Sequence, residues 1–142
     1  MTLRITNPTA FRDQVRAAGA HARRRLADAA EHGVVERDPA PPRGWLAEQF
    51  TVLLAALHDG TVRTCPHVER GGPQLLNAAA WAPGMIVCGN CTDLLTPTGP
   101  ARDTCDRCQR PVPAANGGIA AIGPLMFAYA LCDPCKHEQA AG

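Results

Sequence analysis

Paired cysteine and histidine side chains are the residues in this sequence best suited to chemistry. The chain has seven cysteines in 142 residues, and all of them lie between residues 65 and 135. With one histidine they form four closely spaced pairs: Cys65/His67, Cys88/Cys91, Cys105/Cys108 and Cys132/Cys135. Thiolate and imidazole ligands favour zinc, and four of them complete a tetrahedral structural site. The pattern therefore predicts two structural zinc ions per chain.

Two other uses of the cysteines fit the sequence less well. Disulfides require an oxidising compartment, and the first residues are polar and charged rather than an apolar export signal. The odd number of cysteines would also leave one thiol unpaired. An iron–sulfur cluster takes four cysteines at one site, which only the second half of the pattern offers. We therefore expect zinc, in a cytoplasmic protein.

The order of the pairs suggests an internal repeat. Twenty residues separate the first two pairs, and 23 separate the last two. In each half the second pair follows a short apolar run, residues 85–87 and 128–131. This repeat favours sequential sites, with the first two pairs on one ion and the last two on the other. A crossed arrangement, in which alternate pairs share an ion, stays open.

Short strands and short helices must position these ligands. Residues 61–64, 85–88 and 125–131 have the composition of β-strands. Asn90 is a candidate cap for a helical stretch over residues 92–95, which Pro97 would end. Asp133 is a candidate cap for a final helix with Pro134 in its first position, where a missing N–H costs nothing.

The pattern of one ligand pair in a loop, a β-hairpin and a second ligand pair at the start of a helix resembles the treble-clef and zinc-ribbon modules. The resemblance covers residues 61–138. The stretches from Thr64 to Cys91 and from Cys105 to Cys135 also resemble small uncharacterised proteins of actinobacteria and their mobile elements. The resemblance implies metal binding and no known activity. The first pair, cysteine and histidine, departs from an all-cysteine ribbon and leaves the subtype open.

The N-terminal part has a different character. Apolar residues recur at helical spacing over about residues 9–32 and 45–58, and three prolines lie in the linker at 34–44. We expect an N-terminal helical hairpin over residues 1–60 and a double zinc-binding module with short β-hairpins over residues 61–138. The fold class is therefore small α+β.

The predicted zinc sites argue against catalysis. A catalytic zinc keeps one position open for water, whereas eight protein ligands fill two ions. No Ser/His/Asp arrangement or H-E-x-x-H motif stands out. We therefore expect a non-catalytic adapter that binds another macromolecule. A metal-dependent enzyme or enzyme accessory, with an incompletely ligated zinc, is a further alternative.

Charge limits the other class of function, nucleic-acid binding. The formal net charge is +1, and seven thiolates with two zinc ions would change it to about −2. Arg12, Arg16 and Arg23 nevertheless fall on one side of the first helix, next to an apolar seam that includes Leu26. These four residues are the candidate partner-binding positions, for a protein partner, a second copy of the chain or, as the alternative, nucleic acid. Prolines and glycines interrupt the longest uncharged stretch, so we expect no membrane span.

Overall fold

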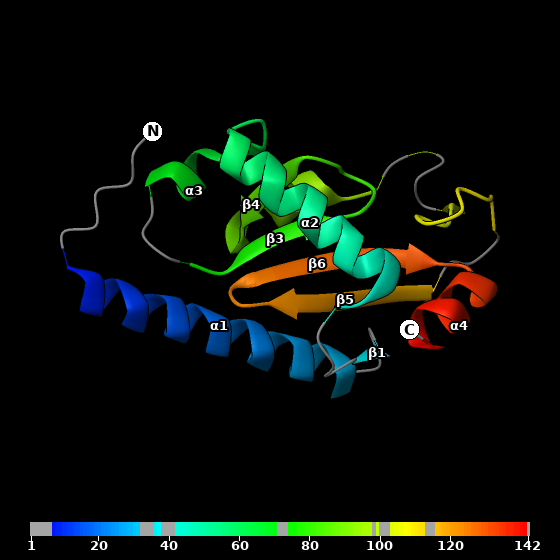
Figure 1. Cartoon of the computed structure of the whole chain (residues 1–142), viewed down its shortest axis with the longest axis horizontal. Helices are drawn as coiled ribbons and strands as arrows, with labels where there is room; N and C mark the ends of the chain where they lie inside the picture. Colours follow the sequence, from blue (N-terminus) through cyan, green and yellow to red (C-terminus); the bar gives the residue numbers. More distant parts are fainter. Residues whose placement is uncertain are drawn as a thin grey trace.

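The structure, a computed structural model, describes residues 7–31, 36–37, 42–70, 74–97, 99, 103–112 and 116–141. A mixed sheet with helices on both faces forms the body of the molecule (Figure 1). Its elements in chain order are α1 (Pro8–Glu31), β1 (Glu36–Arg37), α2 (Gly44–Asp59), β2 (Arg63–Thr64), α3 (Pro66–Arg70), β3 (Leu76–Ala79), β4 (Met85–Cys88), the 3₁₀ helix η1 (Gly89–Leu95), β5 (Asn116–Ile122), β6 (Leu125–Leu131) and α4 (Asp133–Ala141). The α+β class is confirmed, and so are both long N-terminal helices.

The sheet joins two β-hairpins side by side. Its strand order is β1-β5-β6-β3-β4-β2, in which β3 pairs antiparallel with β4 and β5 pairs antiparallel with β6. The hairpins meet where β3 runs parallel to β6, with Leu76 opposite Leu125. Strands β4 and β6 therefore run in opposite directions, and their carboxyl ends lie at opposite ends of the sheet.

Alternate residues of the strands face two different helices. On β6, Leu125 and Phe127 pack against α2, where the Phe127 and Phe50 ring centroids are 5.4 Å apart. Met126 points to the other face and packs with Ala22 of α1, which is fully buried. The two-residue period of a strand thus gives each helix its own apolar surface.

Over the residues that the structure describes, the two N-terminal helices pack on the sheet rather than on one another as the expected hairpin. Instead, α2 lies across one face of the sheet, and α1 runs along the β5–β6 hairpin and packs on the other face (Figure 1). The physical reason is that the sheet is itself apolar on both faces, so it covers both helices. Helix α2 shares its core with β3, β4, β5 and β6, and the predicted boundary near residue 60 stays a prediction.

The C-terminal helix holds the beginning of α2. The side-chain oxygen of Gln139 accepts a hydrogen bond from the backbone N–H of Leu46 at 3.4 Å. The amide nitrogen of Gln139 donates to the Arg43 carbonyl, and the Arg43 guanidinium donates to the Ala140 carbonyl, both at 2.7 Å. These contacts satisfy groups that helix ends leave unpaired, and they connect α2 to α4, the helix that contains Cys135.

Candidate metal centres

The first metal centre lies at the end of the β3–β4 hairpin. We call it centre 1, and its residues are Cys65, His67, Cys88 and Cys91. The parallel pairing of β2 with β4 brings Cys65, which follows β2, next to Cys88, the last residue of β4. Cys91 follows within η1, at a kink where its φ is −112°. The predicted helical stretch is therefore present as a 3₁₀ turn that begins at the second ligand pair.

The dimensions of centre 1 suit a tetrahedral ion. Sulfur and nitrogen ligands at zinc bond lengths would lie about 3.5 Å apart. The Nδ1 atom of His67 lies 3.3 Å from the Cys91 sulfur and 3.7 Å from the Cys88 sulfur. The backbone N–H of Cys88 also donates to the Cys65 sulfur at 3.3 Å. This donor set is consistent with zinc, and Nδ1 is the His67 atom that lies nearest to the Cys88 and Cys91 sulfurs.

The second metal centre lies at the end of the β5–β6 hairpin. We call it centre 2, and its residues are Cys105, Cys108, Cys132 and Cys135. The Cys108 and Cys132 sulfurs are 3.8 Å apart, which is about the edge of a tetrahedron with zinc–sulfur bonds of roughly 2.3 Å. Cys132 follows β6, and Cys135 lies in the first turn of α4. The predicted final helix is present, but Asp133 is its first residue rather than its cap, and the Asp133 carboxylate accepts a hydrogen bond from the Asn116 side-chain amide.

A tight turn presents the first two ligands of centre 2. The Thr104–Pro111 bridge closes this turn, and the N–H of Gln109 donates to the Cys105 carbonyl at 2.9 Å. Gln109 has a φ of 59°, which a non-glycine residue seldom adopts. The turn therefore holds both sulfurs on one side, as two intervening residues allow.

Asp106 ties this turn to the strand that carries the other ligands. Its carboxylate accepts a hydrogen bond from the Ala130 N–H at 2.7 Å, and its own N–H donates to the Ala130 carbonyl at 2.9 Å. Burial raises the pKa of the Asp106 carboxyl, although the Ala130 hydrogen bond acts in the opposite direction. Asp106 was not among the predicted site residues, although its position between Cys105 and Cys108 could have indicated a role at this centre.

Without a cation, the sulfurs of each centre do not all ionise at neutral pH. Burial would raise the pKa of Cys65, but hydrogen bonds from the Cys88 N–H and other groups lower it to about 6. Burial would also raise the pKa of Cys105, but backbone hydrogen bonds lower it to about 6. The pKa of Cys91 rises to about 12 through hydrogen bonding with Cys88, and that of Cys135 rises to about 12, mainly through burial. A divalent cation would stabilise the thiolates that this crowding disfavours.

The structure groups the ligands in the sequential arrangement. In both centres the ligand atoms lie within 4.8 Å of one another, and each group combines neighbouring pairs rather than alternate ones. Because β4 and β6 end at opposite ends of the sheet, the two centres lie at those two ends. Each centre could hold one metal ion.

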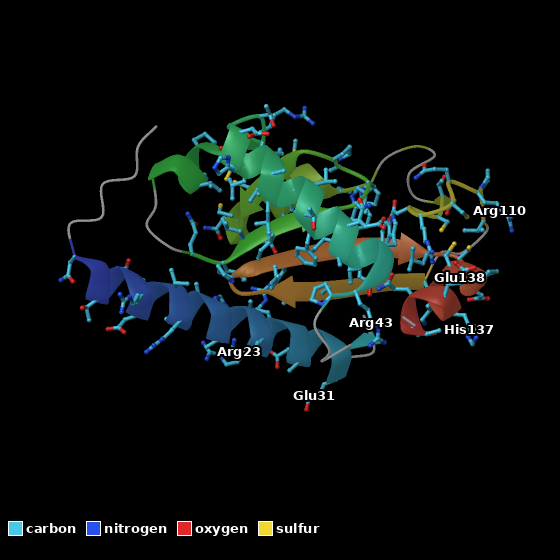
Figure 2. All side chains as sticks on the ribbon, in the orientation of Figure 1. Arg23, Glu31, Arg43, Arg110, His137 and Glu138 are labelled. Carbon is cyan, nitrogen blue, oxygen red and sulfur yellow. The ribbon has the colours of Figure 1, made fainter. Side chains whose placement is uncertain are left out.

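The candidate partner-binding residues lie apart from both centres. Arg12, Arg16 and Arg23 are exposed on α1, and Figure 2 shows Arg23 pointing away from the sheet. The neighbouring Ala18 and Ala22 are buried within the chain itself. The side chain of Leu26 lies outside those that the structure describes. Partner binding at these positions stays a prediction.

Comparison with known proteins adds no relative to this description. No protein-family model, curated protein or solved structure matches the chain. Among the described residues, no helix has the length and hydropathy needed to cross a membrane. The chain is a small fold of mixed helices and strands with two cysteine-rich groups that could each bind metal.

Proposed function

We propose that the chain is a non-catalytic zinc-binding adapter, in which two structural zinc ions hold the ends of the sheet and the surface binds another macromolecule. The observation that supports this proposal most directly is the complete ligand set. In each centre four protein ligand atoms lie within 4.8 Å of one another, and the individual distances of 3.3, 3.7 and 3.8 Å suit a tetrahedral zinc site. A catalytic zinc would need a position for water or substrate.

Two exposed apolar side chains of α2 support the adapter part of the proposal. The buried residues of the helix face the sheet, while Leu54 and Leu57 are 46% and 44% exposed. Residues three apart are neighbours on a helix, and adjacent exposed apolar side chains are typical of a surface that another macromolecule covers. We call Leu54 and Leu57 the α2 surface.

The exposed arginines of α1 support a second candidate, a nucleic-acid-associated regulator. Arg12, Arg16 and Arg23 are all exposed, as contact with phosphates would require. The overall charge of +1 does not favour this candidate. It therefore stands second.

X-ray absorption at the zinc edge tests the non-catalytic part. We expect seven sulfur and one nitrogen ligand per two zinc ions. An additional oxygen ligand would contradict complete protein ligation and favour the metal-enzyme alternative. The measurement needs no knowledge of the partner.

Capture from the native host tests the adapter part. The bait is the wild-type chain, and the matched variants replace the two residues of the α2 surface with serine or the three arginines with glutamate. We expect the α2 variant to lose a captured protein that the arginine variant retains. Loss of salt-sensitive DNA or RNA binding in the arginine variant alone would favour the regulator.

Light scattering of the wild type and of Leu26→Asp tests whether the chain associates with a second copy of itself.

A further inference from the structure

The two metal centres differ in the ligand that is exposed to solvent. In centre 2 the exposed ligand is Cys108, while the other three cysteines are buried. In centre 1 the exposed ligand is His67, and the cysteines are buried or half-buried. A thiolate reacts with peroxides, and its susceptibility rises with its exposure, whereas an imidazole forms neither a sulfenic acid nor a disulfide. Centre 2 therefore presents an exposed ligand that a peroxide can oxidise.

A second sulfur of centre 2 lies next to that of Cys108. The Cys132 sulfur is 3.8 Å away, and a disulfide would bring the two sulfurs to about 2.05 Å. Cys132 is buried, so a peroxide meets Cys108 first. The Cys105 sulfur accepts hydrogen bonds from the backbone N–H groups of Arg107, Cys108 and Cys132, and these lower its nucleophilicity because they stabilise its thiolate. Cys108 and Cys132 are therefore the pair best placed to form a disulfide.

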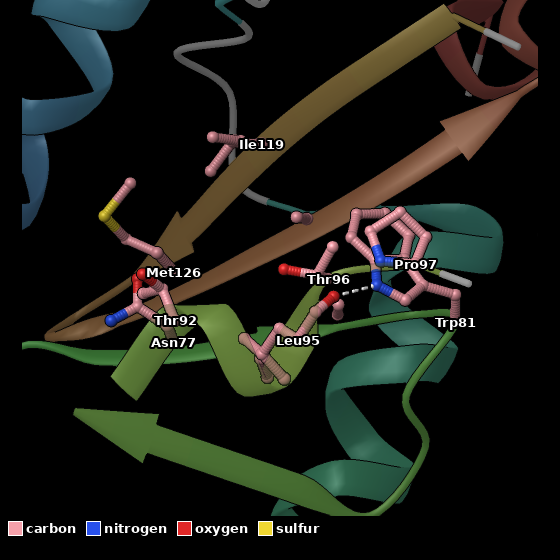
Figure 3. Close-up of a pocket in the computed structure, with 11 residues that line it drawn as sticks. Asn77, Trp81, Thr92, Leu95, Thr96, Pro97, Ile119 and Met126 are labelled. Atoms are coloured by element: carbon pink, nitrogen blue, oxygen red, sulfur yellow. Dashed lines mark hydrogen bonds between the residues drawn. The ribbon is translucent and has the colours of Figure 1, made fainter. Parts of the chain in front are cut away.

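Centre 1 lacks this combination. Its most accessible cysteine, Cys91, is half-buried and lies in η1. The end of η1 is fixed, since the Trp81 indole N–H donates to the Leu95 carbonyl at 2.5 Å (Figure 3). The chain thus contains its own control, because one centre has an exposed sulfur and the other has an exposed imidazole.

We propose that Cys108 is a modification site, at which hydrogen peroxide oxidises centre 2 and causes the release of its zinc ion. The Cys108 thiolate attacks one peroxide oxygen, the O–O bond breaks, and a sulfenic acid and a hydroxide form. The Cys132 thiolate then attacks the Cys108 sulfur, so the S–S bond forms and the S–O bond breaks with loss of a second hydroxide. The two sulfurs together give two electrons to the peroxide, and two protons from solvent convert the hydroxides to water. Only two cysteines remain as ligands, whereas a structural zinc ion needs four.

The contacts of α4 indicate what this oxidation would change. Cys135 lies in the first turn of α4 and would lose the ion that fixes it. Helix α4 in turn holds the beginning of α2, because the Gln139 side chain accepts from the Leu46 N–H and donates to the Arg43 carbonyl. Release of zinc from centre 2 should therefore free α4 from the start of α2. This inference rests on the zinc ion that the proposed function assigns to centre 2.

Hydrogen peroxide added to the zinc-loaded full chain tests the inference. Native mass spectrometry should count two zinc ions per chain before oxidation and one afterwards, and amide hydrogen exchange should become faster in α4 and at Leu46. N-ethylmaleimide then blocks the free thiols, and iodoacetamide labels the sulfurs that reduction of the disulfide releases. We expect the second label on Cys108 and Cys132 alone. Dithiothreitol with zinc should restore the lost ion, since a disulfide is reversible.

Two reciprocal variants exchange the exposed ligands of the centres. Cys108→His gives centre 2 an exposed imidazole, so this variant should keep both zinc ions in peroxide. His67→Cys gives centre 1 an exposed thiolate, so peroxide should release both ions from this variant. The second variant decides the question if Cys108→His does not bind zinc in centre 2.

The zinc count before oxidation separates this inference from the proposed function. Absence of zinc from centre 2 at that stage would contradict both. Retention of both ions in peroxide, or a second label on the cysteines of centre 1, would overturn this inference alone. A disulfide that excludes Cys132, or loss of a single ion from His67→Cys, would do so as well.

Discussion

Replacing one ligand in either metal centre should remove one zinc ion and leave the other in place. Cys108→Ser is the cleaner change in centre 2, because Cys108 is exposed and its replacement opens no buried cavity. Cys91→Ser is the matched change in centre 1, where Cys91 is half-buried. The sequential grouping predicts one zinc ion per chain in each variant.

The expected damage is large and confined to one end of the sheet. A structural zinc contributes an apparent binding free energy of roughly 10–16 kcal/mol in small peptides. The net stability of a whole domain is about 5–15 kcal/mol. Loss of zinc from centre 2 should therefore open the turn at 103–112 and the start of α4. The core between α2 and the sheet should keep the other end folded.

Native mass spectrometry counts the zinc ions, and amide hydrogen exchange locates the damage. In Cys108→Ser we expect faster exchange at residues 103–112 and 131–137 and unchanged exchange at 85–95. In Cys91→Ser the pattern should reverse. Loss of both ions from either variant would refute the independence of the two centres. Retention of two tightly bound ions in Cys108→Ser would refute the ligand assignment.

Four further predictions concern individual residues and the protonation of the metal ligands. Asp106→Ala removes the acceptor that ties the centre 2 turn to β6, so zinc affinity at that centre should fall about 10- to 100-fold in a chelator competition assay. Gly19→Ala should stabilise α1 by about 0.5–1 kcal/mol in urea unfolding, because an added Cβ would meet its nearest atom at an ordinary 3.6 Å. Gly118→Ala should instead cost about 1–3 kcal/mol, since the added Cβ would lie 2.6 Å from the Tyr129 ring. Zinc affinity should fall as the pH falls, because protons compete with zinc for every ligand. Zinc binding at pH 7 should in turn release protons from thiols such as that of Cys135, whose pKa is about 12 in the metal-free centre.

The two cysteine-rich groups and the strands that precede them could be predicted from sequence because their signals are local. Two residues between cysteines permit one turn to present both sulfurs, and apolar runs end at Cys88 and Leu131. The final helix could be predicted as well, since Asp133 and Pro134 are typical of the start of a helix. Each of these features depends on fewer than about ten neighbouring residues.

Strands β3 and β5 could not be predicted because many of their residues are small. Strand β3 reads Leu76-Asn-Ala-Ala79, and β5 begins with Asn116-Gly-Gly, so neither has the branched or aromatic composition of a typical strand. Their role depends on distant partners. Ala78 lies in the core under α2, and Gly118 leaves space for Tyr129. The packing of α1 and α2 on opposite faces of the sheet could not be predicted either, because it depends on a sheet in which the strand β3 lacks a typical strand composition.

The position of the two centres explains how a chain with few large apolar residues holds this sheet together. Only 4% of its residues are aromatic, and the central strand β3 contributes alanines to the core. Small side chains bury little surface, so packing alone gives each hairpin limited stability. A metal ion at the carboxyl end of β4 and another at the carboxyl end of β6 would each join a hairpin to the turn and helix beside it. The two helices then cover the middle of the sheet, α2 on one face and α1 on the other.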